Sequence, residues 1–106
     1  MNEVFLIGKI IGNIEFKFII NSKNISIVKF KIKTIDNQVI NIKGYNEIAD
    51  YIYSKLQKNN YIEIYGSIDT EETVTINIIE KLSDNFVEKW QWKLYFNIIF
   101  NEHILN

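Results

Sequence analysis

Cysteine, proline and arginine are all absent from this 106-residue chain, and its single histidine is His103. The lack of cysteine excludes a disulfide scaffold, a thiolate zinc site and a cysteine nucleophile. One histidine is too few for a histidine metal cluster or a catalytic triad, so we interpret His103 as a surface residue. We therefore expect no metal and no cofactor.

Motifs for catalysis and signals for membrane insertion are missing as well. No phosphate-binding glycine loop, dinucleotide fingerprint or H-E-x-x-H motif occurs. The adjacent acids Glu71 and Glu72 lie in a predicted turn without a partner base. No signal peptide is visible, and no apolar run is long enough to cross a bilayer. These absences predict a non-enzymatic, cytoplasmic protein without a membrane contact or a small-molecule substrate.

Charge is distributed unevenly along the chain, although the formal net charge is only −1. Seven lysines and two acids lie between Lys9 and Lys43, whereas five lysines and ten acids follow from Gly44 onward. One interpretation is a face of positive potential that attracts an anionic partner. The other is that lysine is simply the cation that this composition uses, and charge alone does not decide between them.

Strand patterns dominate the first part of the chain. A first strand runs from Val4 and resumes after a glycine bend at Gly12 to end near Ile20. A second strand, Ile25–Thr34, alternates apolar residues with three lysines, and Val39–Lys43 forms a third strand. A bend in a long first strand allows it to pair with two different neighbours.

The period changes to that of a helix between Glu47 and Lys58, with Asn46 as the expected N-cap. Strand patterns return at Tyr61–Ile68 and from Val74 onward, separated by an acidic turn. The order of three strands, one helix and two strands is that of a five-stranded OB barrel. We therefore predict an all-β fold with one helix, and assign residues 1–82 to this domain.

The remaining residues, 83–106, form a C-terminal extension with a period of two. Between Phe86 and Phe100 its even-numbered positions other than Glu88 are apolar: Phe86, Trp90, Trp92, Leu94, Phe96, Ile98 and Phe100. This pattern predicts an extra strand from about Phe86 to Phe100, called here the aromatic segment. A long strand with such an aromatic face must cover a sheet, pair with another subunit or hold a ligand. We expect Trp90, Trp92 and Phe96 to pack on the barrel or on another subunit.

Several segments of the chain resemble the bacterial single-stranded DNA-binding protein family. Asn2–Ile10 is similar to its first strand, N-x-V-x-L-[IV]-G-[RKN]-L, and Asn13–Phe18 to its D-P-E-[LV]-R-[YF] segment. Ile27–Ile32 resembles V-A-x-F-x-L, and Gly44 occupies the place of the glycine of W-G-K or F-G-K. The helix and the fourth strand also follow the family pattern, so that the resemblance covers about residues 1–80.

The resemblance implies an OB fold that forms a dimer or tetramer and coats single-stranded DNA without sequence preference. An RNA-binding OB module is a further possibility, because contacts to phosphate do not distinguish the two sugars. It implies roles in DNA replication, recombination or repair at the nucleoid. Such a site combines cations that follow the phosphates with aromatic rings that stack on bases. The residues proposed for it are Lys9, Lys17, Lys29, Lys31, Lys33, Lys43, Phe16 and Phe18.

Three departures from the family pattern support an alternative hypothesis. Lys43 stands where the family often has an aromatic residue, the 69–73 loop is short and acidic, and the acidic C-terminal tip is missing. These features are also compatible with an OB-fold protein-interaction module that has lost or weakened nucleic-acid binding.

Overall fold

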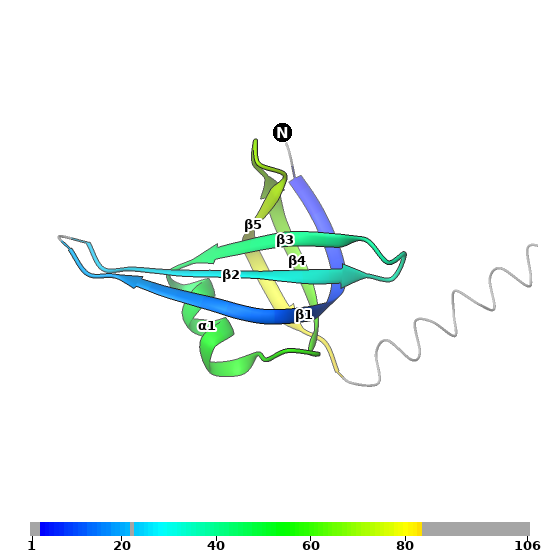
Figure 1. The fold of residues 1–106 in the computed structure, drawn as a ribbon, viewed down its shortest axis with the longest axis horizontal. Coiled ribbons are helices and arrows are strands. Elements are labelled where there is room, and N and C mark those ends of the chain that lie inside the picture. Colours follow the sequence, from blue (N-terminus) through cyan, green and yellow to red (C-terminus); the bar gives the residue numbers. More distant parts are fainter. Residues whose placement is uncertain (1–2, 22, 84–106) are drawn as a thin grey trace, which may run out of the picture.

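The computed structural model describes residues 3–21 and 23–83 (Figure 1). The predicted strand from Phe86 to Phe100, with Trp90, Trp92 and Phe96, lies outside the described residues, as does His103. The elements follow the predicted order: β1 (Glu3–Ile19), β2 (Ile25–Thr34), β3 (Val39–Tyr45), α1 (Glu47–Lys55), β4 (Tyr61–Ile68) and β5 (Thr73–Lys81).

The five strands close into a barrel in the order β1-β2-β3-β5-β4. Neighbouring strands are antiparallel except β3 and β5, which pair in parallel over three residues. This closed barrel with one helix between its third and fourth strands confirms the predicted OB fold.

The 17-residue strand β1 belongs to two parts of the barrel wall, as its length predicted. Its first half, Glu3–Lys9, pairs with β4, whereas its second half pairs with β2 up to Ile19. The β1–β2 register shifts between Ile11 and Glu15, and Gly12 within this interval has a φ of 68°. Because L-residues rarely adopt a positive φ, the glycine permits the bend that lets β1 change partner.

Alternation along the strands separates an apolar interior from a polar outer surface. Even-numbered residues of β1, β2, β3, β4 and the first half of β5 point inward. With three residues of the helix region they form the core: Ile10, Val28, Phe30, Ile32, Ile42, Ala49, Ile52, Leu56, Ile62, Ile64, Val74 and Ile76. The odd-numbered residues of the same strands therefore make up the outer face.

Helix α1 packs against β2, β3 and β5 and is shorter than the sequence predicted. It ends at Lys55 because Leu56 is extended, and Asn60 accepts a hydrogen bond from the Gln57 backbone N–H at 2.8 Å. Asn46 is the N-cap residue, as predicted, and its backbone carbonyl accepts a hydrogen bond from the Asp50 N–H at 2.9 Å. Its side chain makes no cap hydrogen bond, and the side-chain oxygen instead lies 3.4 Å from the Ser26 backbone nitrogen. In the part of the chain that the structure describes, no helix is long and apolar enough to span a bilayer.

Candidate nucleic-acid interface

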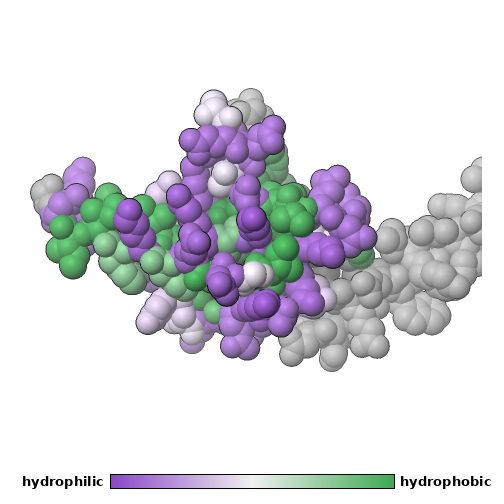
Figure 2. Space-filling view, in the orientation of Figure 1, coloured by the Kyte–Doolittle hydropathy of each residue, from purple (hydrophilic) through white to green (hydrophobic). Residues whose placement is uncertain are grey.

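The outer face of β1, β2 and β3 carries the lysines that the sequence singled out. The strand registers place the outward residues in four cross-strand rows. In strand order β1, β2, β3 the rows are Lys9–Lys33–Val39, Ile11–Lys31–Asn41, Glu15–Lys29–Lys43 and Lys17–Ile27–Tyr45. Figure 2 shows hydrophilic side chains gathered over the middle of these strands. The fold thus brings all six predicted lysines to one continuous surface, called here the lysine face.

Three lysines of β2 lie in line along this surface. Lys29, Lys31 and Lys33 are all exposed and are separated by about 6.6 Å along the strand, the rise of two β residues. Lys9 lies directly across from Lys33, so two like charges face each other on neighbouring strands. Such pairs destabilise a sheet unless an anion lies between them, and phosphate is an anion of the required kind.

A depression of about 540 Å³, called here the groove, runs along the middle of the lysine face. Its floor and sides come from the bend of β1, the middle of β2, β3 and the β4–β5 loop. The lining residues are Ile11, Gly12, Asn13, Glu15, Lys29, Phe30, Lys31, Asn41, Ile42, Lys43, Tyr45, Glu71 and Thr73. In OB folds the surface of strands 2 and 3, flanked by the β1–β2 and β4–β5 loops, is the usual position for an oligonucleotide.

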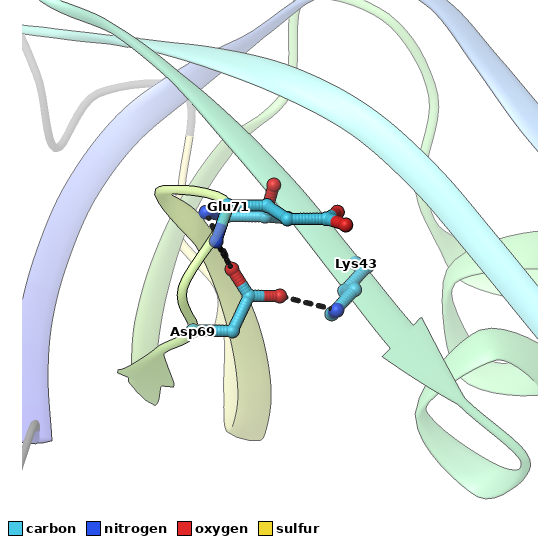
Figure 3. Close-up of polar contacts among 4 residues, drawn as sticks. Lys43, Asp69 and Glu71 are labelled. Atoms are coloured by element: carbon cyan, nitrogen blue, oxygen red, sulfur yellow. Dashed lines mark hydrogen bonds and ion pairs between the residues drawn. The ribbon is translucent and has the colours of Figure 1, made fainter.

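Lys43 differs from the other lysines because its charge is already partnered. Its Nζ lies 2.5 Å from Oδ2 of Asp69 in the β4–β5 loop (Figure 3). The other carboxylate oxygen of Asp69 accepts hydrogen bonds from the backbone N–H groups of Glu71 and Thr73 at 2.9 and 3.0 Å. These contacts fix the carboxylate at the edge of the groove.

The ion pair shifts the titration of both partners. The hydrogen bond from Lys43, followed by that from the Thr73 N–H, holds the pKa of Asp69 below its ordinary value. The same hydrogen bond to Asp69 raises the pKa of Lys43. Both groups therefore stay charged at neutral pH, and Glu15 and Glu71 add two further negative charges to the lining of the groove.

The two phenylalanines proposed for stacking do not join the lysine face. Phe16 lies across from the buried Val28, on the inward side of β1, and packs against the core. Its ring meets that of Tyr53 of α1 edge-on, with centroids 5.0 Å apart. Phe18 is 59 % exposed but lies on the same side, with its centroid 6.5 Å from that of Tyr53.

Two aromatic residues line the groove, the buried Phe30 and the exposed Tyr45, and sequence reasoning did not single out Tyr45. It is 40 % exposed at the end of β3, in the row that contains Lys17. The signal was present in the sequence, because Tyr45 has the same parity as Asn41 and Lys43. The predicted strand, however, ended at Lys43 and left Tyr45 outside it.

No family model matches the chain, and no curated protein matches it either. Several solved structures, however, are similar to it. The SSB domain of a Synechococcus protein has a TM-score of 0.63 at 12 % identity, over 76 % of this chain and 94 % of that one. The mitochondrial single-stranded DNA binding protein of S. cerevisiae has a TM-score of 0.62 at 18 % identity, over 76 % and 93 % of the two chains.

A third similar structure is the single-stranded DNA binding protein of Thermus aquaticus, with a TM-score of 0.68 at 15 % identity. That match covers 78 % of this chain and 41 % of the Thermus protein. At these identities the likeness establishes the fold: the chain is a divergent OB barrel resembling those of single-stranded DNA-binding proteins.

Proposed function

We propose that this protein binds single-stranded DNA, without sequence preference, across the lysine face. The observation that carries the proposal is that Lys9, Lys17, Lys29, Lys31, Lys33 and Lys43 share one outer surface of the barrel. The protein coats the strand stoichiometrically and catalyses no reaction. The titles of the similar structures, which name single-stranded DNA-binding proteins, support this choice of ligand.

The lysines of β2 supply the phosphate contacts. Their regular spacing along an exposed strand suits a ligand whose charges repeat along an extended backbone. Contacts to phosphate carry no sequence information, which agrees with a coating role. Tyr45 supplies a ring on which a base can stack at one end of the groove, and stacking is also tolerant of sequence.

The proposed setting follows from this activity. Single strands are exposed during DNA replication, recombination and repair, so we place the protein at the nucleoid in the cytoplasm. RNA is a second substrate to test, since phosphate contacts and stacking do not depend on the sugar. We also propose that the protein acts as a homo-oligomer, a dimer or a tetramer, as the family resemblance implies.

The test is a fluorescence anisotropy titration of a labelled oligo(dT) strand, at low and then at physiological salt. We expect binding that weakens steeply with salt and that duplex DNA does not compete away. Unlabelled oligo(U) then measures the preference between DNA and RNA.

A matched pair of variants locates the interface. Lys29→Glu combined with Lys31→Glu should abolish binding, because both exposed lysines line the groove. Lys55→Glu combined with Lys58→Glu makes the same change in net charge at exposed positions outside the groove, and should leave most of the affinity. Equal losses from both pairs would show that only net charge matters and would overturn the assigned face.

The acids of the groove favour a second candidate function, a protein-interaction module. Asp69 forms an ion pair with Lys43, and Glu15 and Glu71 line the same groove. A partner surface with both charges would suit such a mixed lining better than a uniform polyanion does. The absence of any oligo(dT) binding at low salt would favour this function over the first.

A further inference from the structure

An exposed apolar row crosses β1, β4 and β5 on the outside of the barrel. Phe5 lies opposite Tyr65, and Tyr65 lies opposite Ile78. Their side chains are 50 %, 45 % and 61 % exposed. The two rings contact each other in a tilted arrangement with centroids 4.7 Å apart. We call this row the apolar row.

The apolar row is separate from the lysine face. It uses the first half of β1, which pairs with β4, whereas the groove uses the bend of β1 together with β2 and β3. None of its three residues lines the groove. The proposed DNA site therefore leaves this surface uncovered, and a contiguous exposed aromatic and aliphatic surface indicates an interaction site.

Two acidic residues border the apolar row. In the adjacent outward row Ile7 lies opposite Glu63, and Glu63 lies opposite Glu80. Like charges directly across two strands destabilise the sheet. Within residues 3–21 and 23–83 the single ion pair joins Lys43 to Asp69, so neither Glu63 nor Glu80 has a cationic partner there. The surface thus favours an occupant that combines aromatic side chains with positive charge.

The aromatic segment of the same chain has this composition. From Trp90 to Phe100 every second residue is apolar, and the lysines Lys89 and Lys93 outnumber the one acid, Glu88, so the segment carries a net positive charge. Strand β5 carries Ile78 and ends at Lys81, five residues before the aromatic segment begins at Phe86. Five residues separate Ile78 from Ser83, about 17 Å in extended form, whereas fifteen extended residues span about 50 Å. The segment is therefore long enough to return over the apolar row.

We propose that the aromatic segment docks on the apolar row of its own chain. Its even-numbered side chains, Trp90 and Trp92 among them, cover Phe5, Tyr65 and Ile78. Lys89 and Lys93 bring positive charge close to Glu63 and Glu80, and this attraction acts over several ångströms without direct contact. The docking covers a part of the outer surface of the barrel that is separate from the proposed DNA site.

Tryptophan fluorescence of the full chain tests the proposal directly, because Trp90 and Trp92 are the only two tryptophans. Docking predicts a blue-shifted emission that acrylamide quenches poorly. Ile78→Lys should shift the emission to the red and increase quenching, since it places a charge in the apolar row. Val39→Lys is the matched control: Val39 is also an exposed β-branched strand residue, 55 % exposed, but lies outside the row.

A second measurement uses the lack of cysteine. Ile78→Cys combined with Trp92→Cys introduces one pair that a short bifunctional thiol reagent can join, and Val39→Cys combined with Trp92→Cys serves as its control. We expect a link within one chain for the first pair and none for the second. This readout does not depend on how Ile78→Lys affects stability, and circular dichroism confirms that each variant is folded.

Two results would overturn the proposal. In the first, Ile78→Lys leaves the emission and quenching unchanged and the cysteine pair gives no intrachain link. In the second, the link forms between chains and the emission shifts to the red on dilution, which would assign the apolar row to a second copy of the protein.

Discussion

Lys43 of β3 and Asp69 of the β4–β5 loop form an ion pair at the edge of the groove on the lysine face. The pair joins residues 26 positions apart in the sequence. Asp69 is held in place by two backbone N–H groups of its own loop, so its carboxylate occupies the position where a phosphate would approach Lys43. In the proposed DNA interface the loop would therefore compete with phosphate for one of the six lysines.

The first prediction is that Asp69→Asn strengthens binding to oligo(dT). Asparagine retains the oxygen that accepts the loop N–H bonds but loses the charge that neutralises Lys43. We expect an affinity gain of about twofold to fivefold, the scale of an exposed ion pair. The slope of log affinity against log salt should also steepen by about one, because one more phosphate contact forms.

Glu72→Gln is the matched control for this change. It removes the same charge from the same loop, but Glu72 is exposed, forms no ion pair in the described part of the chain and does not line the groove. A gain of equal size in both variants would mean that general electrostatics, and not the release of Lys43, causes the effect.

A second prediction concerns Lys43 itself. In the native background Lys43→Gln should change affinity little, since the ammonium group of Lys43 already forms an ion pair with Asp69. In the Asp69→Asn background the same substitution should remove the gain that Asp69→Asn produced. The anisotropy titrations of the four proteins form a double-mutant cycle, and additive effects in it would contradict the competition.

The third prediction is a pH dependence of stability. Because the pKa of Asp69 is lowered in the folded state, its stabilisation is present at neutral pH and is lost as the pH falls through that lowered pKa. Because the pKa of Lys43 is raised, its part is lost only as the pH rises through the raised value. The difference in Tm between the native protein and Asp69→Asn should therefore stay constant from about pH 5 to 9 and close below about pH 4. A difference that persists in strong acid would contradict the ion pair as its source.

The fourth prediction assigns the stacking position to Tyr45. Tyr45→Ala should weaken oligo(dT) binding by about fivefold to a hundredfold, the range of one stacked base, while Tyr45→Phe should retain affinity. Tyr53→Ala is the control, because Tyr53 is 65 % exposed on α1 and contacts Phe16. Phe18→Ala should also leave binding unchanged, since that ring lies on the side of β1 opposite to Lys17. A loss with Phe18→Ala and none with Tyr45→Ala would return the stacking role to the phenylalanine.

Alternation along single strands made much of this architecture predictable. The period of two in β2 separates Val28, Phe30 and Ile32, which are buried, from the three exposed lysines. The order of the elements then specified the barrel. In each case the information lies within one strand or in the succession of elements, which the sequence displays directly.

Contacts between distant parts of the chain were not predictable in this way. The ion pair of Lys43 with Asp69 depends on the parallel pairing of β3 with β5, which brings a loop 26 residues away to the groove. The position of Phe16 depends on which side of β1 faces inward after the bend, and that is decided by pairing with Val28. Local patterns reveal which residues share a side of a strand, whereas the fold decides which side meets the core.

The last prediction concerns Gly66 of β4, a position where the fold leaves no room for a side chain. A Cβ there would lie 2.2 Å from the carbonyl oxygen of Thr75 and 3.0 Å from a methyl carbon of Val74. The nearest obstacle is backbone of β5, so it can move only by disturbing the β4–β5 register, which already shifts at this point. Gly66→Ala should lower the free energy of unfolding by about 1–3 kcal/mol or more, measured by urea denaturation. Gly12→Asn is the comparison: its backbone also needs glycine-like freedom, but no atom lies within 4 Å and asparagine tolerates a positive φ. A cost at Gly12 equal to that at Gly66 would contradict the steric origin of the effect.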